Sequence, residues 1–502
     1  MNLFSLIRGR IASPQKAFIR TPAGAVLTYA DMLARTAQLA DTLVRAGVQP
    51  GDRVAVQVEK TPENFLLYLA TLRAGAVYLP LNTAYTLAEL DYFIGDAEPA
   101  LVVCDPAKRA GIGEIAARRG VRAVETLDAA GRGSLSEAAA GAPAGFADVA
   151  RTHEDLAAIL YTSGTTGRSK GAMLTHRNLS SNAETLREYW RFTANDVLLH
   201  ALPIYHTHGL FVAGNTVMLA GGAMIFLPKF DADEVMRLLP QATSMMGVPT
   251  FYTRLLRHPG LTRQACAHMR LFTSGSAPLL AETHTEFREK TGHAILERYG
   301  MTETNMNTSN PYDGERVAGT VGFALPGVDV RIADPETGRV LAQGEVGGIE
   351  VRGPNVFPGY WRMPEKTKAE FRADGFFITG DVGKIDARGY VHIVGRAKDL
   401  IITGGFNVYP KEIESEIDAL PGVVESAVIG CPHPDFGEGV TAVVVCKPGA
   451  ALSEKAVIAE LEQRLARFKL PKRVLFVDDL PRNTMGKVQK NVLREQNARL
   501  YG

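Results

Sequence analysis

Apolar residues near the start of the chain follow two alternating patterns. Thr28 and Asp31 form a capping box, and the apolar positions after them repeat with helical spacing. The short apolar runs 53–59 and 76–81 are typical of buried strands, and residues 62–73 between them predict a helix. This alternation predicts right-handed βαβ units and a parallel sheet that is buried on both faces.

The same alternation returns later in the chain. Strands are predicted at 156–163, 269–276 and 294–300. A helix that runs through Glu289 and ends at Gly292 precedes the last of these strands. No fixed period repeats along the sequence, which argues against a repeat protein.

Other regions differ in their composition and in their pattern of apolar residues. Residues 105–150 are rich in Ala and Gly and weakly patterned, so we expect a peripheral helix and a surface loop. After about residue 340, short β-rich segments alternate with turn residues, which predicts a β-rich subdomain. A small α+β unit follows, with the hinge expected at 395–399. The predicted fold class is α/β, with a large N-terminal domain over residues 1–395 and a small C-terminal domain over 396–502.

The composition mainly excludes functions. The 502 residues suffice for about three structural units of roughly 150 residues each. The 55 Lys and Arg residues nearly balance the 54 Asp and Glu residues, so we expect neither nucleic acid nor a membrane as a partner. The four cysteines lie far apart, which argues against a zinc ribbon or a disulfide framework. The N-terminal residues lack a signal-peptide pattern, and no run approaches the roughly 20 apolar residues of a membrane helix, so we expect a cytoplasmic protein.

The strongest local motif is YTSGTTGRSKG at residues 161–171, between two predicted strands. Backbone N–H groups and hydroxyls in such a loop can surround phosphate oxygens, and Lys170 adds positive charge. The spacing differs from a Walker A loop, and a strand rather than a helix follows it, which argues against a P-loop kinase. A surface turn without a ligand is the alternative for this motif alone.

Further motifs occur in order along nearly the whole chain. They are YTSGTTGRSKGAMLTH (161–176), PIYHTHG (203–209), ERYGMTE (297–303), GYWRMPEKT (359–367), FFITGDVG (376–383), VGRAKDLIITGGFNVYPKEIE (394–414) and LPRNTMGK (480–487). Together they resemble the acyl-adenylate-forming family of acyl-CoA synthetases, luciferases and peptide-synthetase adenylation domains. The resemblance implies a nucleotide site on the large domain and a small, mobile C-terminal domain that rotates between two poses. It also implies ATP, Mg²⁺ and coenzyme A as cofactors or co-substrates and a carboxylic acid as substrate, with protein partners left open.

The resemblance assigns residues to the phosphates and the metal. Thr302 would lie near the α-phosphate, and Glu303 would bind Mg²⁺, an ion that prefers oxygen ligands and keeps several waters. Without the family context, Glu303 would be interpreted as a solvated strand end. The β- and γ-phosphates would be held by Thr162, Ser163, Gly164, Thr165, Thr166, Gly167 and Lys170.

The resemblance also assigns residues to the nucleoside. Tyr299 would pack against adenine, and Glu297 belongs to the same nucleotide site. Asp381 would accept a hydrogen bond from a ribose hydroxyl, and Arg396 would donate one. Without the family context, Asp381 and Arg396 would be interpreted as members of surface ion pairs.

By resemblance, Lys487 is the adenylation lysine, in a segment where Gly486 leaves room for a ligand. Its ammonium would bridge the attacking carboxylate and the α-phosphate as pyrophosphate leaves. Lys398 occupies the hinge position of the family. Gly404 and Gly405 would line the pantetheine channel, and an ordinary tight turn is the alternative for this pair.

The segment PIYHTHG contains an HxH pair, but no third ligand is evident at suitable spacing, which argues against catalytic zinc. By resemblance, His206 is the aromatic gate between the acyl pocket and the CoA channel, and Thr207 contacts the acid. The segments that resemble the malonyl-CoA synthetase branch of the family are GVPTFYTRLL (247–256), SGSAPLL (274–280) and ERYGMTETNM (297–306).

A malonate pocket must hold a second carboxylate, and an arginine can engage a carboxylate through two parallel hydrogen bonds. Arg254 and Arg298 are the candidates for this cation, and an exposed helical position is the alternative for Arg254. Ser276 would add a hydroxyl, and Met306 would form a wall that limits bulk at the α-carbon of the acid. We expect such a pocket to exclude fatty acids.

The sequence thus predicts an ATP-dependent acid–thiol ligase that forms malonyl-CoA from malonate through an acyl-adenylate and releases AMP and pyrophosphate. Methylmalonate is an open alternative, as is another short-chain or aromatic acid. An adenylation enzyme that loads a carrier-protein thiol would share these motifs, and free CoA as the acceptor would separate the two. A non-catalytic nucleotide-binding relative is disfavoured, because Lys487, Glu303 and the phosphate loop are all present.

Overall fold

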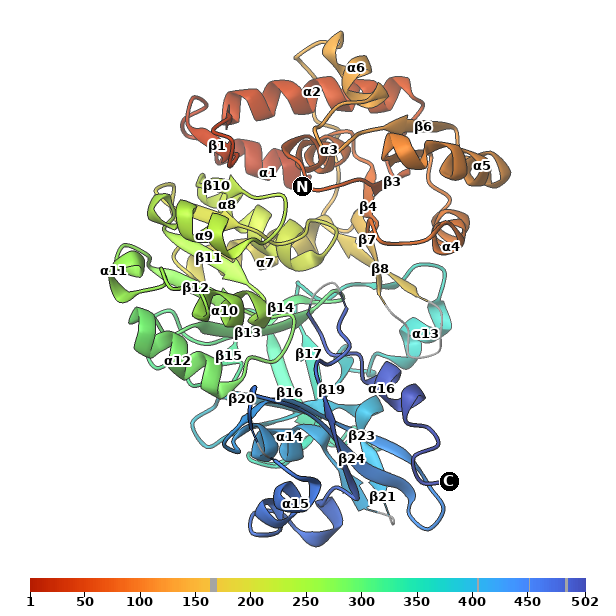
Figure 1. The fold of residues 1–502 in the computed structure, drawn as a ribbon. Coiled ribbons are helices and arrows are strands. Elements are labelled where there is room, and N and C mark those ends of the chain that lie inside the picture. The colour runs from red at the N-terminus through yellow and green to blue at the C-terminus, as the bar shows by residue number, and fades with distance from the viewer. Residues whose placement is uncertain (163–168, 404–405, 451, 484–485) are drawn as a thin grey trace.

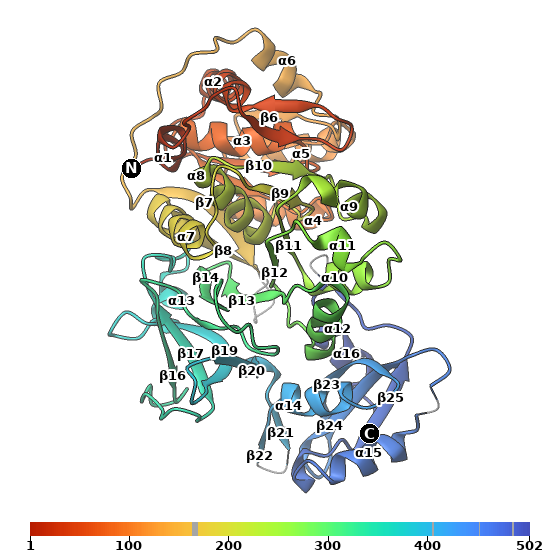
Figure 2. The ribbon, with the colours of Figure 1, turned by 90° about the vertical axis from the view of Figure 1, so that its left-hand side faces the viewer.

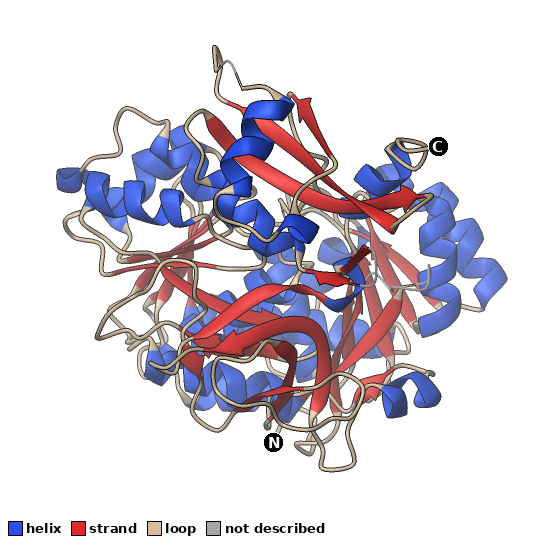
Figure 3. Cartoon of the chain, turned by 90° about the horizontal axis from the view of Figure 1, so that it is seen from below, coloured by secondary structure: helices blue, strands red, loops and turns tan. Residues whose placement is uncertain are grey.

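The computed structural model describes residues 1–162, 169–403, 406–450, 452–483 and 486–502. Within these residues the strands form four sheets, of nine, seven, four and five strands. The two largest sheets and their helices occupy the upper part of Figure 1, and the C-terminal domain lies below them. Helices flank the strands on several sides (Figure 3). The predicted α/β class, with a large N-terminal part and a smaller C-terminal part, is confirmed.

The seven-stranded sheet is parallel through its centre, as the βαβ pattern predicts. The pairs β7–β4, β4–β3, β3–β5 and β5–β6 are parallel, and β8 and β18 add antiparallel strands at one edge. Val54 and Val56 of β3 pack in one buried cluster and Ala55 packs in another, so both faces are covered. In sheet order the strands are β18 (Gly359–Tyr360), β8 (Lys170–Thr175), β7 (Leu156–Thr162), β4 (Val77–Pro80), β3 (Arg53–Gln57), β5 (Leu101–Cys104) and β6 (Ala123–Thr126).

The nine-stranded sheet also has a parallel centre, from β13 through β12, β11, β9 and β10 to β1. Antiparallel strands close both of its edges, β14 and β15 at one side and β2 at the other. In sheet order the strands are β15 (Phe323–Ala324), β14 (Asn305–Ser309), β13 (Leu296–Met301), β12 (Leu271–Ser274), β11 (Ser244–Gly247), β9 (Val197–His200), β10 (Ala223–Phe226), β1 (Ala17–Arg20) and β2 (Val26–Thr28).

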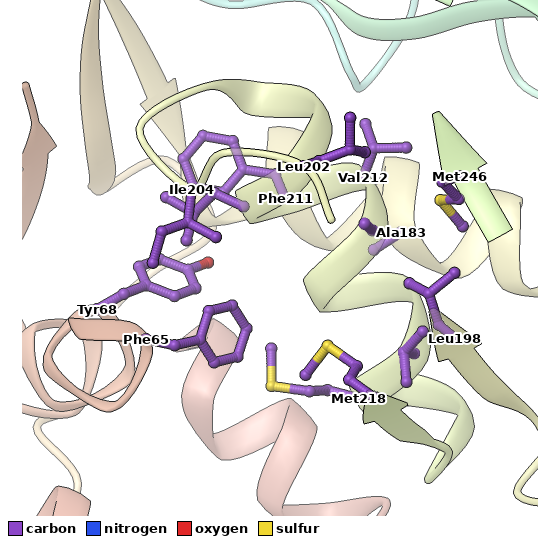
Figure 4. Packing of buried hydrophobic residues seen from close by; sticks show 14 of the residues in the cluster. Phe65, Tyr68, Ala183, Leu198, Leu202, Ile204, Phe211, Val212, Met218 and Met246 are labelled. Carbon is purple, nitrogen blue, oxygen red and sulfur yellow. The ribbon is translucent and has the colours of Figure 1, made fainter. Parts of the chain in front are cut away.

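One interior helix joins the two large sheets. α3 (Pro62–Arg73) is buried from Asn64 to its end, and its aromatic rings contact both sides. Phe65 lies 5.6 Å from Phe226 of the nine-stranded sheet, measured between ring centroids, and Tyr68 lies 5.2 Å from Tyr78 of the seven-stranded sheet. Figure 4 shows these α3 side chains beside those of the π-helix η2 (His208–Asn215), which begins within the PIYHTHG segment.

The remaining helices of the N-terminal domain pack around these sheets. α2 begins at the predicted capping box of Thr28 and Asp31, and α12 ends at the predicted Gly292. The helices are α1 (Leu3–Gly9), α2 (Tyr29–Arg45), α4 (Leu87–Ala97), η1 (Pro106–Lys108), α5 (Arg109–Arg119), α6 (Ser134–Ala140), α7 (His176–Tyr189), α8 (Thr216–Ala220), α9 (Ala232–Leu238), η3 (Leu239–Gln241), α10 (Pro249–Leu256), α11 (Arg263–Cys266) and α12 (Ala281–Thr291).

An antiparallel β-rich sheet follows, and then the C-terminal domain. The β-rich part comprises β16 (Asp329–Ala333), β17 (Gly347–Arg352), α13 (Pro364–Ala369), β19 (Phe377–Ile385) and β20 (Val391–Arg396). The C-terminal elements are η4 (Ala397–Asp399), β21 (Ile401–Thr403), β22 (Phe406–Val408), α14 (Pro410–Asp418), β23 (Val423–His433), β24 (Gly437–Cys446), α15 (Glu454–Glu462), η5 (Arg467–Lys469), β25 (Arg473–Val477) and α16 (Lys490–Gln496).

Two sequence-based expectations need correction. The segment 105–150 holds α5, α6 and the strand β6, which is more than the predicted helix and loop. β6 lies at a sheet edge and only Thr126 of its residues is buried, so it lacks the apolar run that marks an interior strand. The β-rich sheet begins at Asp329 rather than at about 340. The sequence pattern missed its first strand, β16, because the first residues of this strand are half-exposed. Among the described residues, no helix is both long and apolar enough to cross a bilayer.

A buried ion pair ties the end of the 105–150 segment to α3. Arg73 Nε lies 2.8 Å from Asp148 Oδ1, and the two side chains are 6% and 4% exposed. The half-exposed Arg8 contacts the other carboxylate oxygen at 3.1 Å. We expect Arg73→Met to lower the free energy of unfolding by about 3 kcal/mol, because the buried Asp148 would keep only the half-exposed Arg8 and the Ser5 hydroxyl as partners, both at Oδ2.

Urea unfolding followed by tryptophan fluorescence measures this loss, since both tryptophans, Trp190 and Trp361, belong to the N-terminal domain. Arg177→Met is a matched control, because it removes an exposed pair with Glu154 and should change the stability by less than about 1 kcal/mol. Equal losses in the two variants would contradict the special role of the buried pair.

Candidate functional site

Motifs from distant parts of the sequence meet at the carboxyl ends of strands in both large sheets. His206 follows β9, Ser276 follows β12 and Arg298 lies on β13, while Lys170 opens β8 beside the carboxyl end of β7. Open α/β sheets bind their ligands at this edge. Figure 2 shows β13 between the N-terminal sheets above and the C-terminal domain below. The candidate residues therefore share one region between the two domains.

The predicted ribose partners lie side by side. Arg396 Nε is 3.0 Å from Asp381 Oδ1, and these residues are register partners on β20 and β19. The Tyr299 hydroxyl donates to Asp381 Oδ2 at 2.6 Å. Burial and the adjacent Asp381 carboxylate raise the pKa of Tyr299 well above its usual value, so the phenol stays protonated. Asp381 thus connects Tyr299, which is predicted to pack against adenine, to Arg396, the other residue that is predicted to bind the ribose.

Glu297 is buried near the start of β13, the strand that also carries Tyr299. Its Oε1 accepts a hydrogen bond from the backbone N–H of Leu279 at 3.2 Å, while Oε2 has no partner among the described residues. Burial raises the pKa of Glu297 to about 8, so the carboxyl group is mostly protonated at neutral pH. A polar group on the edge of a bound ligand could form a hydrogen bond with Oε2. Thr302, predicted near the α-phosphate, is half-buried just beyond the end of β13.

The predicted phosphate lysine is held by residues that sequence analysis missed. Lys170 Nζ lies 3.2 Å from Glu370 Oε1 and 4.0 Å from the centre of the Tyr360 ring. Tyr360 belongs to the motif GYWRMPEKT, but the motif alone gave it no role. Thr162 pairs with Lys170 across β7 and β8. The other predicted phosphate residues, Ser163, Gly164, Thr165, Thr166 and Gly167, lie outside the described residues.

Glu303 suits a magnesium ion that also contacts phosphates. Its carboxylate is buried, burial raises its pKa, and Oε1 lies 3.0 Å from the Tyr360 hydroxyl. A buried carboxylate with so little compensation gains from a cation. No group of three or more His, Cys, Asp or Glu residues in the described part of the chain could hold a metal ion. Glu303 would therefore share the ion with phosphate oxygens and water.

Lys487 reaches the same region from the C-terminal domain. Gly486, at φ +74°, lies against α10, where an added Cβ would come within 2.9 Å of Thr250 Cγ2. Burial and the adjacent Arg396 lower the pKa of Lys487 to about 8. Lys487 is also among the charges that lower the pKa of His206 to about 4, after burial and Arg298. The predicted adenylation lysine thus lies between the ribose partners and the predicted gate.

The predicted hinge residue Lys398 is exposed in the short helix η4. Its neighbour Asp399 pairs with Arg494 of α16 at 3.0 Å. The predicted channel residues Gly404 and Gly405 lie outside the described residues. The predicted hinge thus lies in a short exposed segment between β20 and β21.

Arg298 is the most unusual of the residues predicted for the acid pocket. It is 2% exposed, and its Nε and Nη2 have no hydrogen-bond partner among the described residues. Burial lowers the pKa of Arg298 to about 9, which leaves the guanidinium charged at neutral pH. Gly275 makes room for it, since an added Cβ would lie 2.5 Å from the Cζ atom of Arg298. Arg254, the other candidate, is exposed in the last turn of α10.

Thr207 and Met306 are also predicted for the acid pocket, and both are buried. The Thr207 hydroxyl donates to Asn305 Oδ1 at 2.7 Å, and Asn305 has a left-handed φ of +51°. Met306 is 1% exposed, and its Cε would lie 2.6 Å from a Cβ on Gly300. Sequence analysis missed Asn305, whose importance depends on the tight β13–β14 hairpin.

Comparison with known proteins agrees with this geometry. Residues 12–361 match the AMP-binding enzyme family, and residues 412–487 match the C-terminal domain of AMP-binding enzymes. The chain belongs to the AMP-binding enzyme family. A family member with 37% identity over 98% of both chains is a feruloyl-CoA synthase from an Amycolatopsis species. Another, with 37% identity over 93% of this chain and 86% of its own, is the mitochondrial malonate–CoA ligase of Mus musculus.

Solved structures of MatB from Rhodopseudomonas palustris are 68% identical in sequence to this chain and match 100% of it and 99% of their own length. The TM-score is 0.98 with the ATP-bound form and 0.87 with the apo form. The structure of this chain is therefore more similar to the ATP-bound form than to the apo form.

The lowered pKa of Lys487 predicts an alkaline loss of adenylation. Because the pKa is about 8, the ammonium loses its proton as the pH rises past that value, and its charge at the phosphates is lost. We expect kcat/KM for ATP to fall by about tenfold per pH unit above about pH 8, measured as pyrophosphate release with saturating acid. Lys487→Arg, which stays charged, should lack this limb even if its rate is lower. A limb that persists in Lys487→Arg would assign the titration to another group.

Proposed function

We propose that this chain is a malonate–CoA ligase that works in two half-reactions. A carboxylate oxygen of malonate attacks the α-phosphorus of ATP, which forms malonyl-AMP and releases pyrophosphate. The thiolate sulfur of CoA then attacks the acyl carbon, which forms malonyl-CoA and releases AMP. Membership of the AMP-binding enzyme family supports the adenylate route, and the mouse relative carries the name of a malonate–CoA ligase.

The buried guanidinium of Arg298 is the observation that carries the choice of malonate. An unpaired buried cation is unfavourable unless an anion completes it. When one carboxylate of malonate lies at the α-phosphate, the other is free to enter the pocket and accept two hydrogen bonds from Arg298. Ferulate has no second carboxylate. The unpaired guanidinium therefore favours malonate, the acid in the name of the mouse relative, over ferulate, the acid in the name of the Amycolatopsis relative.

The other residues divide the work of adenylation. Lys487 would stabilise the charge that develops at the α-phosphate, and Lys170 would contact the β- and γ-phosphates. Mg²⁺ bound by Glu303 would supply positive charge that neutralises the phosphate oxygens. Thr207 and Met306 would limit the space beside the acid.

We further propose that the chain divides into the domains 1–395 and 396–502 and that the second rotates between the half-reactions. The separate match of residues 412–487 to a C-terminal domain supports the division. The different TM-scores with the ATP-bound and apo forms of the Rhodopseudomonas relative support the rotation. We place the enzyme in the cytoplasm, which agrees with the absence of a disulfide among its cysteines, all four of which are free.

The test of the function is AMP and acyl-CoA formation with ATP, Mg²⁺ and CoA across malonate, methylmalonate, succinate, acetate, propionate and benzoate. We expect malonate to give the highest kcat/KM. Arg298→Ala should lower kcat/KM for malonate by about a hundredfold or more, because the hydrogen bonds that it removes are to a charged group, and should affect propionate far less.

Arg254→Ala serves as the comparison, since Arg254 is exposed and we expect little change from its removal. Equal losses for malonate and propionate in Arg298→Ala would reassign Arg298 to scaffolding. Preference of the wild type for a monoacid would refute the malonate assignment, and AMP formation without acyl-CoA would favour a carrier protein as the acceptor.

The rotation proposal predicts that Lys487 acts in one half-reaction only. Lys487→Ala should slow adenylation by about a hundredfold or more, because it removes a charge that stabilises the transition state. Thioester formation from supplied malonyl-AMP and CoA should continue at nearly the wild-type rate. Single-turnover assays of each half-reaction measure the two effects, and a parallel loss in both would refute the separation of roles.

A further inference from the structure

We propose that His208 is a second hydrogen-bond donor to the distal carboxylate of the acid, beside Arg298, and that Ser276 is the positioning residue that fixes its ring. This inference rests on the proposed function, since it concerns the same pocket. Sequence analysis treated His208 only as the second half of an HxH pair and assigned it no role.

The ring of His208 is buried with one nitrogen satisfied and one free. His208 is 0% exposed and opens the π-helix η2, a type of helix that is frequent at functional sites. Its Nδ1 lies 3.1 Å from the Ser276 hydroxyl oxygen. Its Nε2 is buried and has no hydrogen-bond partner in the part of the chain that the structure describes. Buried polar atoms almost always have partners, so Nε2 is available to bond a ligand.

The contact with Ser276 determines what Nε2 can do. Ser276 has a left-handed φ of +71°, which holds its hydroxyl toward the ring. When this hydroxyl donates to Nδ1, the proton of the neutral ring resides on Nε2, which is then a donor. Burial and the nearby Arg298 charge lower the pKa of His208 well below its usual value, so the ring is neutral. Ser276 therefore acts through His208 rather than on the acid itself.

His208 and Arg298 make one site, because Ser276 contacts the histidine ring while its neighbour Gly275 lies against the guanidinium. Nε2 of His208 and Nε and Nη2 of Arg298 are all buried without partners among the described residues, and the arginine charge acts on the histidine ring. All of these atoms can donate, and a carboxylate has about four acceptor positions for them. A monoacid would leave them unsatisfied, and sites built to hydrogen-bond a group strongly reject analogues that lack it.

Three variants test this assignment through the ratio of kcat/KM for malonate to that for propionate. His208→Leu removes the donor, and we expect the ratio to fall by about tenfold to a hundredfold, as for a hydrogen bond to a charged group. His208→Gln keeps an N–H near the position of Nε2 and should recover part of the ratio. Ser276→Ala should lower the ratio by a smaller factor, because the tautomer and the ring orientation are no longer fixed.

His284→Leu is the matched control. His284 is another buried histidine of the N-terminal domain, and its Nε2 contacts the backbone oxygen of Ile295 at 3.1 Å, away from the pocket. It should change the stability of the fold but leave the ratio as in the wild type. Malonate binding in the presence of a non-hydrolysable ATP analogue, measured by calorimetry, gives a readout that does not depend on turnover and should weaken in His208→Leu.

The outcomes separate this inference from the proposed function. A wild type that does not use malonate refutes the function. A wild type that uses malonate, with a ratio that falls in Arg298→Ala and stays unchanged in His208→Leu, refutes the role of His208 alone. If His208→Leu does not fold, His208→Gln and Ser276→Ala still decide, because wild-type ratios in both would overturn the assignment.

Discussion

The arrangement of the site depends on one carboxylate, that of Asp381. It accepts the Tyr299 hydroxyl from the nine-stranded sheet and the Arg396 guanidinium from the last strand before the C-terminal domain. Lys487 enters its field from the C-terminal domain, and Asp381 is among the groups that raise the pKa of Lys487. Three parts of the chain thus meet at a single negative charge, which offsets the repulsion between Arg396 and Lys487 while the nucleotide site is formed.

The acid pocket shows the opposite principle, since its polar atoms are left without partners. The large core can tolerate an unpaired Arg298 because so much apolar surface is buried around it. The unfavourable free energy of these unpaired atoms is concentrated where a bound ligand can offset it, which is typical of sites that reject close analogues. Two glycines maintain this geometry: Gly275 admits the guanidinium, and Gly300 admits the backbone carbonyl of Asn305 in the adjoining hairpin.

Sequence reasoning predicted what local pattern and motif order determine. The helix at 62–73, the capping box at Thr28 and the parallel strands follow from periodicity, and the structure confirms them. It could not separate Arg254 from Arg298, because that choice depends on which side of each element is covered. Glu370 and His208 were missed for the same reason, since their roles come from partners that only the tertiary fold brings close. The edge strand β6 was missed because half-exposed strands lack a continuous apolar run.

Two ion pairs flank the proposed hinge and limit where the proposed rotation could occur. Asp381 holds Arg396, which is the last residue of β20 and belongs to the β-rich sheet. Asp399 pairs with Arg494 of α16, so it moves with the C-terminal domain. Between these anchors lie only two residues, Ala397 and the exposed Lys398. We infer that a rotation which preserves both pairs must change the backbone angles there, and that it would carry Lys487 away from His206 as a unit, opening the gate for the CoA thiol.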